Sequence, residues 1–281
     1  MDDIARHNQA RWDELARSGV EYARPYLDLT CETAREVVDT RRVLDGLGPL
    51  EGREVLCLAS GGGQQSVAFA LLGARTTVLD LSSAQLERDR EAATHYGLSI
   101  TAVQGDMRDL SMFGDAHFDV VWHAYSINFV PDVQPVLAEV ARVLRPGGLY
   151  RLDWANPFTA NLDESDWCGH GYPLRSPYRD GEELSFDHPG WTFRDGEGNE
   201  REVPGPREFR HGLGTVINGM LAHGLRLLGL WEHGLGDPEA APGTWEHLKA
   251  VAPRWLECWA AREPRQPSAH SDAPARSARA L

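Results

Sequence analysis

The chain has 281 residues, of which 42% are hydrophobic and 25% are charged, and its formal net charge is −14 at pH 7. This acidic balance disfavours a nucleic-acid binder, and the apolar fraction is typical of a globular protein with a sizeable core. No apolar run approaches the roughly 20 residues that span a bilayer, and the acidic start Met1-Asp2-Asp3 is unlike a signal peptide. We therefore expect a cytoplasmic protein with no membrane partner.

The first 45 residues are polar and amphipathic, and Gly19 and Pro25 interrupt the helical spacing of their apolar positions. This pattern predicts two or three helices ahead of the main fold, which we take as a helical lid over residues 1–45. The four cysteines are widely scattered and include no Cys-x-x-Cys pair. We expect free thiols and no metal site.

Residues 46–155 alternate between short apolar runs and amphipathic stretches. Such alternation predicts an α/β fold, a Rossmann-like sheet of mostly parallel strands with helices on both faces. The expected strands are 54–59, 76–81, 100–104, 118–122 and 149–154, and the expected helices are 65–72, 83–96 and 133–144, the last ended by Arg145-Pro146-Gly147-Gly148.

The alternation breaks down over residues 156–207, which are rich in Gly, Pro, Asp and aromatic residues. We interpret them as a cap insertion over the carboxyl edge of the sheet, with a β-hairpin near Trp191-Thr192-Phe193. The core fold is expected to resume over 208–261, with a strand at 208–211, a helix at 214–223, a strand at 225–231 and a helical region at 245–261. Residues 262–281 have the composition of a disordered tail.

A glycine-rich turn, Ser60-Gly61-Gly62-Gly63, follows the first strand and precedes a helix. Backbone N–H groups can approach a ligand closely at such a turn because no Cβ stands in the way. Asp80 ends the second strand, where a carboxylate can accept both hydroxyls of a ribose, and Asp106 follows the third, where it can accept from an exocyclic amine. Each signal alone is weak, and their order and intervals give them specificity.

Over residues 54–154, with weaker agreement over 209–231, the chain resembles class I S-adenosylmethionine-dependent methyltransferases of the ubiquinone/menaquinone type. The markers are the strand and glycine turn, Asp80, Gly105-Asp106-Met107, Phe118-Asp119-Val120-Val121, Asn128-Phe129-Val130-Pro131-Asp132 and Val143-Leu144-Arg145-Pro146-Gly147-Gly148. The resemblance implies a seven-stranded sheet, S-adenosyl-L-methionine as the cofactor and methyl transfer as the reaction.

The resemblance also implies roles for single residues. Gly61 and Gly63 would pack against the methionine part of the cofactor, Asp80 would bind the ribose, and Asp106 and the Met107 amide would meet the adenine. The full set of implied cofactor residues is Ala59, Ser60, Gly61, Gly63, Gln64, Asp80, Leu81, Gln85, Asp106, Met107 and His123.

Two positions depart from the family pattern. Cys57 stands where an acidic residue is common in the first strand, and Ala59 stands where the first glycine of the turn is common. Because a thiol cannot replace the hydrogen bonds of a carboxylate, we expect carbonyls around Ala59, together with His123 or Gln64, to hold the methionine ammonium.

The acceptor side is less determined. His123, His211, Tyr22 and Tyr26 are candidate bases, and Tyr26, Trp154, Trp167, Trp191 and His211 are candidate acceptor-binding residues; each could equally serve ordinary packing. With an aromatic-rich cap and no basic strip, we expect a small aromatic or heteroaromatic acceptor, such as an indole, phenol or amine of natural-product tailoring. The protein would be a monomer or homodimer.

Two other functions stay open. An acid at the end of the second strand also suits a nicotinamide-dependent oxidoreductase, but the third glycine of G-x-G-x-x-G is missing and the single lysine, Lys249, is not part of a Tyr-x-x-x-Lys pair. The second alternative is a non-catalytic S-adenosylmethionine-binding protein. Cofactor binding without turnover would indicate it.

Overall fold

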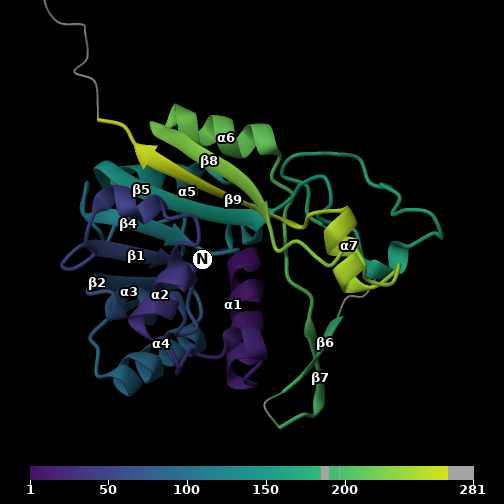
Figure 1. The fold of residues 1–281 in the computed structure, drawn as a ribbon, viewed down its shortest axis with the longest axis horizontal. Helices are drawn as coiled ribbons and strands as arrows, with labels where there is room; N and C mark the ends of the chain where they lie inside the picture. The colour runs from purple at the N-terminus through teal and green to yellow at the C-terminus, as the bar shows by residue number, and fades with distance from the viewer. Residues whose placement is uncertain (185–189, 196, 265–281) are drawn as a thin grey trace, which may run out of the picture.

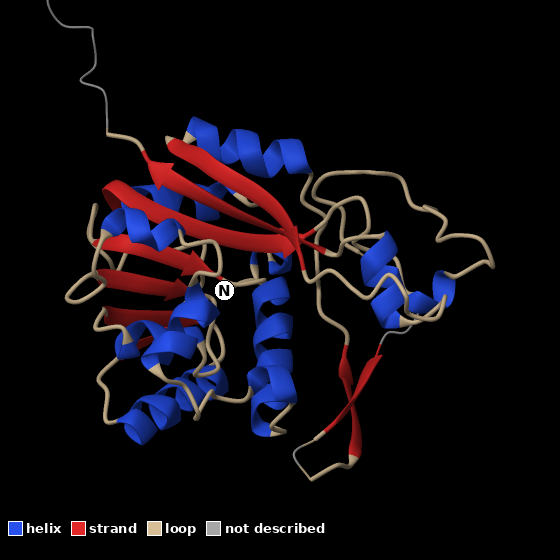
Figure 2. Ribbon diagram, in the orientation of Figure 1, coloured by secondary structure: helices blue, strands red, loops and turns tan. Residues whose placement is uncertain are grey.

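The computed structural model describes residues 1–184, 190–195 and 197–264, so that most of the expected tail lies outside the described residues. Its main sheet has seven strands in the order β3-β2-β1-β4-β5-β9-β8, flanked by helices (Figures 1 and 2). Strands β3, β2, β1, β4 and β5 are parallel, and β9 runs antiparallel to both β5 and β8. The strands are β1 Glu54–Leu58, β2 Arg75–Asp80, β3 Thr101–Gln104, β4 Phe118–His123, β5 Leu144–Ala155, β8 Leu225–His233 and β9 Trp255–Arg262.

The helices confirm most of the expected alternation. They are α1 Asp3–Arg17, α2 Cys31–Val38, α3 Gln65–Leu71, α4 Ser83–Tyr96, α5 Gln134–Val143, α6 Leu213–Ala222 and α7 Trp245–Val251. α4 has the bounds expected from its sequence because Ser82 caps its first turn and Gly97 ends it in the left-handed conformation. The expected hairpin is also present, as β6 Gly190–Arg194 paired with β7 Glu200–Pro204.

Alternate residues of β1 belong to different sides of the sheet. Leu56 and Leu58 are part of the core that α5 and α6 cover, whereas Val55 and Cys57 are part of the core that α2 and α3 cover. All four side chains are fully buried. After Glu54 the first strand is therefore apolar, as is typical of a central parallel strand. Cys57 lies on the side of the sheet where α4 also contributes Leu86.

The expected helix over 245–261 is wrong. Helix α7 ends at Val251, and the chain continues through Pro253 into the inner strand β9. Proline cannot donate a helical hydrogen bond and restricts the residue before it, and Ala252 has an extended φ of −134°. Because β9 is covered on both faces, its apolar run lacks the alternation that distinguishes a strand from a helix.

Two smaller expectations are also corrected. The Arg145–Gly148 stretch, expected to lie between a helix and a strand, is the irregular start of β5, where Gly147 has a φ of +80° and a Cβ on Gly148 would lie 3.0 Å from the Asp119 carbonyl. The expected strand over 208–211 is reduced to a single bridge between Glu183 and Phe209. Its backbone pairs instead with two loops, for example through the Phe209 N–H and the Asn128 carbonyl.

The N-terminal helix and the segment that follows β5 lie at the carboxyl ends of the parallel strands. In Figure 1, α1 stands across these ends, with the β6–β7 hairpin beyond it. α1 contacts α4, β7 and the short helix Ile127–Phe129 that follows β4. This edge is where an open α/β sheet binds its ligands.

Candidate functional site

The glycine turn between β1 and α3 is tied to Asp80 at the tip of β2. Asp80 accepts hydrogen bonds from the Gly61 N–H at 2.9 Å and the Ser82 N–H at 2.8 Å. A Cβ on Gly61 would lie 2.7 Å from the Gln85 Cβ, so that only glycine fits there. Burial raises the pKa of Asp80 to about 6. Each oxygen of the carboxylate keeps a second lone pair with which to accept a hydroxyl.

Ala59 adopts the conformation that favours glycine. Its φ is +45°, in the left-handed region, where an L-residue is strained by roughly 1–2 kcal/mol. The Ala59 N–H donates to the Leu79 carbonyl at 2.7 Å, which fixes the start of the turn. Alanine at this position is therefore accommodated with backbone strain.

The second and third glycines of the turn are paired with Asp89 of α4, a residue that the sequence analysis did not single out. The Gly62 and Gly63 N–H groups donate to its two carboxylate oxygens at 2.9 and 3.0 Å. A Cβ on Gly63 would lie 2.5 Å from the Arg88 carbonyl and 2.8 Å from the Pro25 Cβ. The turn is thus enclosed by α4 on one side and by the N-terminal segment on the other.

The segment that contains Tyr22 and Tyr26 lies on the glycine turn. The Tyr26 N–H donates to the Gly63 carbonyl at 3.0 Å, and the Gln64 Nε2 donates to the carbonyls of Tyr22 and Arg24 at 3.1 and 3.0 Å. Tyr22 and Tyr26 are 43% and 39% exposed, and the partial burial of Tyr22 raises the pKa of its hydroxyl above the usual value. Their roles as bases stay predictions.

α1 also holds the loop after β2. The Gln9 Nε2 and the Gln104 Nε2 both donate to the Leu81 carbonyl, at 3.0 and 2.9 Å, and Asp13 accepts from the Ser82 hydroxyl at 2.6 Å. The carboxylate of Asp13 is thereby placed at the start of α4. The N-terminal helix consequently bridges two of the loops that carry implied cofactor residues.

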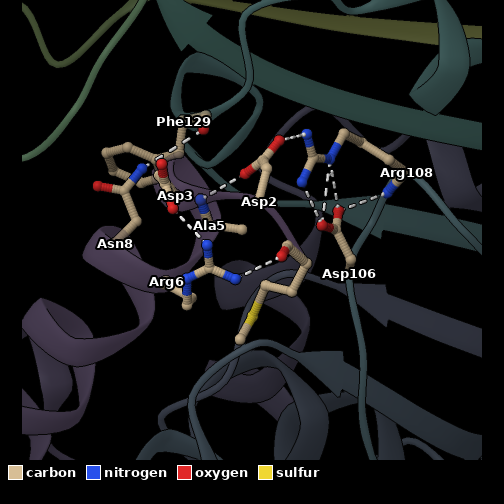
Figure 3. A network of polar contacts seen from close by, with 9 residues as sticks. Asp2, Asp3, Ala5, Arg6, Asn8, Asp106, Arg108 and Phe129 are labelled. Carbon is tan, nitrogen blue, oxygen red and sulfur yellow. Dashed lines mark hydrogen bonds and ion pairs between the residues drawn. The ribbon is translucent and has the colours of Figure 1, made fainter.

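Asp106, expected to meet the adenine amine, is held by Arg108. The Arg108 Nε donates to both Asp106 oxygens, at 3.0 and 3.1 Å, and its Nη1 reaches the Asp2 carboxylate at 2.6 Å (Figure 3). Asp2 in turn caps α1 by accepting from the Ala5 N–H. Met107 beside them is buried. The predicted contact of this segment with the adenine stays a prediction. An adenine bound there would have to lie beside Arg108.

The two candidate histidines are enclosed. His123 is fully buried at the end of β4, where its Nδ1 lies 2.9 Å from the Tyr150 hydroxyl, and burial beside Arg151 lowers its pKa to about 3. His211 is also buried, with its Nε2 3.1 Å from the Ile127 carbonyl, and burial lowers its pKa. Both imidazoles are neutral at pH 7. These contacts support packing better than proton transfer.

The candidate tryptophans belong to separate regions. Trp154 is fully buried in the core under α5 and α6, whereas Trp167 packs against Tyr172 and His247 beside α7. Trp191 lies on β6. The expected cage of these three residues stays a prediction.

A second polar cluster, which the sequence analysis missed, gathers at the carboxyl edge around Glu208. Burial raises the pKa of Glu208 to about 7, against the attraction of Arg11 and Arg254. Burial and the nearby Glu208 raise the pKa of Tyr125, which follows β4. The Glu208 carbonyl accepts from the Leu184 N–H at 2.7 Å, which anchors this segment to the cap. The cluster thus joins α1, the β4 loop, the cap and the start of β9.

The Methyltransferase domain family matches residues 56–152. The uncharacterized methyltransferase YbaJ of Bacillus subtilis is 35% identical over 243 residues, covering 83% of this chain and 91% of that protein. The chain belongs to the S-adenosylmethionine-dependent methyltransferases. The cypemycin N-terminal methyltransferase of a Streptomyces species is 36% identical over 130 residues, covering 45% of this chain and 51% of that one.

The fold of this methyltransferase agrees with solved structures. An S-adenosylmethionine-dependent methyltransferase from Mesorhizobium loti superposes with a TM-score of 0.54 at 20% identity, covering 84% of this chain and 100% of that one. The family gives S-adenosyl-L-methionine as the cofactor. Over the described ranges, no helix is long and apolar enough to cross a bilayer, and no three His, Cys, Asp or Glu side chains gather as metal ligands would.

The residues at the turn of this methyltransferase fit its cofactor. The buried Gln85 Oε1 and His123 Nε2 have no hydrogen-bond partner within the described part of the chain. A Cβ on Gly62 would lie 3.4 Å from that same Gln85 oxygen, which places an unsatisfied acceptor against the turn. S-adenosylmethionine carries ribose hydroxyls and an ammonium group, and these donors can satisfy such acceptors. The contacts of Asp80 and Gln85 with the cofactor stay predictions.

Proposed function

We propose that this methyltransferase methylates a small aromatic or heteroaromatic metabolite, such as an indole, phenol or amine, in natural-product tailoring. The observation that carries the proposal is the Glu208 cluster, an ionisable carboxyl close to Tyr125 at the ligand edge of the sheet. The relative whose name places methylation at the N-terminus of cypemycin adds weight to an amine among these acceptors.

When bound, the cofactor supplies an electrophilic methyl group on a sulfonium. Asp80 and Gln85 would orient it, and the N-terminal segment docked on Gly63 would exclude water from the turn. Methyl transfer to an acceptor nitrogen or oxygen would leave the carbon–sulfur electron pair on sulfur and a proton to be lost from the acceptor. The Glu208 carboxylate would take the proton that the acceptor loses.

Glu208 suits this task better than the expected histidines do. A carboxyl with a pKa of about 7 is half ionised near neutral pH, so that it can both accept a proton and release it to water. His211 lies against a backbone carbonyl, and His123 against a tyrosine hydroxyl. We propose Glu208 as the base, with Tyr125 next to the acceptor.

The direct experiment is incubation with methyl-labelled S-adenosylmethionine and a panel of indoles, phenols and amines, read by mass spectrometry. We expect label in at least one aromatic acceptor with an ionisable N–H or O–H. Calorimetric binding of the cofactor with no transfer to any member of the panel would favour the non-catalytic alternative. Transfer only to aliphatic thiols or to nucleic acid would contradict the proposed acceptor class.

A further inference from the structure

Asp89 is the most completely enclosed carboxylate near the cofactor turn. It lies on α4 rather than at a strand tip, and it is 0% exposed. Burial of a lone carboxylate is costly unless hydrogen bonds compensate it. The hydrogen bonds of the Asp89 carboxylate therefore have to compensate for its burial.

Its hydrogen bonds all go to the turn and to the helix after it. The Gly62 and Gly63 N–H groups donate to separate oxygens, and the Ser66 hydroxyl on α3 donates to one of them. These are the amides that a ligand at the turn would otherwise meet. Asp89 thus fixes the direction of both N–H groups.

The electrostatics around Asp89 are one-sided. Burial, together with the neighbouring Asp80, raises its pKa to about 7. Asp80 is itself influenced by Asp13, and Asp89 raises the pKa of the buried Cys57 thiol. Each of these charged or titratable neighbours is acidic. A cation bound over the turn would relieve the repulsion among them, and S-adenosylmethionine carries both a sulfonium and an ammonium.

We propose that Asp89 is a positioning residue of the cofactor site, which orients the glycine turn and supplies it with buried negative charge that favours a cationic ligand. The side chain acts from α4 and raises the pKa of Cys57 of β1, the position at which the acid expected in the first strand is missing. The proposal concerns cofactor affinity and does not depend on the identity of the acceptor.

The test is calorimetric titration of the full chain with S-adenosylmethionine between pH 5.5 and 8.5, values chosen as about 1.5 units on either side of the Asp89 pKa. Asp89→Asn should weaken binding about tenfold or more at pH 8, because it removes a charged acceptor from two amides. The matched control is Glu87→Gln on the exposed side of α4, where Glu87 pairs with Arg90 at 3.1 Å. This variant should bind within about twofold of the wild type.

The pH profile separates positioning from mere stability. In the wild type, affinity should fall as the pH is lowered through about 7, because Asp89 takes up a proton. Asp89→Asn should lose that part of the dependence and keep the part near pH 6 that belongs to Asp80. The groups that face Asp89 are Ser66 on α3, Asp80 on β2 and Cys57 on β1, with Asp13 of α1 acting on Asp80.

A second variant keeps the test decisive if Asp89→Asn does not fold. Ser66→Ala removes one hydrogen bond that lowers the pKa of Asp89, so that the midpoint of the wild-type profile should move to higher pH. An unchanged midpoint in Ser66→Ala would overturn the proposal. So would a folded Asp89→Asn protein that binds the cofactor within about twofold of the wild type across the whole range.

Discussion

At the scale of single residues, the cofactor turn depends on two carboxylates with different positions. Asp80 lies at a strand tip, where the sequence pattern predicts it, and Asp89 lies behind the turn on a helix. Nothing in the run Glu87-Arg88-Asp89-Arg90-Glu91 distinguishes Asp89 from its charged neighbours. Its role follows only from the packing of α4 against α3. The sequence pattern did not predict a role for Glu208 either, because its neighbours come from distant parts of the chain.

Replacing Asp80 tests the ribose side of the site. Asp80→Ala should weaken S-adenosylmethionine binding by about 1–3 kcal/mol, since it removes the acceptor of the Gly61 N–H and the proposed acceptor of a ribose hydroxyl of the cofactor. Isothermal titration calorimetry measures the change. An unaltered affinity would argue against a role of Asp80 in cofactor binding.

Replacing Glu208 tests the acceptor side. Glu208→Gln should lower turnover by about 10²- to 10⁴-fold with any acceptor that loses a proton, and leave cofactor affinity unchanged. Because the carboxyl must be ionised to act as a base, wild-type turnover should rise with pH through about 7, and the variant should lose this rise. The comparison is His211→Gln: if that variant loses turnover while Glu208→Gln keeps it, the base is the histidine.

At the scale of elements, the fold was predictable wherever local signals agree. The cap residues of α4 and the glycine turn before α3 predict where these two helices begin, and the structure has them there. The start of β5 and the whole of β9 could not be placed, because a bulge and a strand buried on both faces carry no periodic signal. Pro253 was the available signal against a continuous helix, since a helix rarely continues across a proline.

Gly63 of the turn and Gly97 at the end of α4 form a matched pair of glycines. Gly63 and Gly97 have φ values of +72° and +65°, but a Cβ on Gly63 would meet Arg88 and Pro25, whereas Gly97 has nothing within 4 Å. Gly97→Ala should cost about 1 kcal/mol of stability from backbone strain alone. Gly63→Ala should cost more and also weaken cofactor binding, because the N-terminal segment must move. Urea unfolding and calorimetry report both quantities, and equal effects of the two substitutions would refute the close packing.

At the scale of the whole molecule, the sheet order and the N-terminal helix bring distant segments to one edge. Residues from α1, the loops after β1, β2 and β4, and the segment at 208 all meet at the carboxyl ends of the strands (Figure 1). A Rossmann-like sheet is predictable from alternation alone. Which side chains of the cap and of α1 meet there is not, because irregular segments have no period from which to infer their direction.

Ligand-linked stability compares the binding of S-adenosylmethionine with that of nicotinamide dinucleotides. At about 100 times its dissociation constant, S-adenosylmethionine should stabilise the protein by about 2.7 kcal/mol. For a domain of this size, that corresponds to a rise of roughly 5–10 °C in melting temperature. NAD or NADP at millimolar concentration should produce no shift. A rise with a nicotinamide dinucleotide alone would reinstate the oxidoreductase alternative.

The ion pair between Asp2 and Arg108 gives the second residue of the chain a part in the geometry around Asp106. A purification tag fused ahead of Met1 would bring extra peptide, often rich in imidazole, next to this pair. Recombinant material intended for affinity measurements is therefore better extended at the opposite terminus, or cleaved back to Met1 before use.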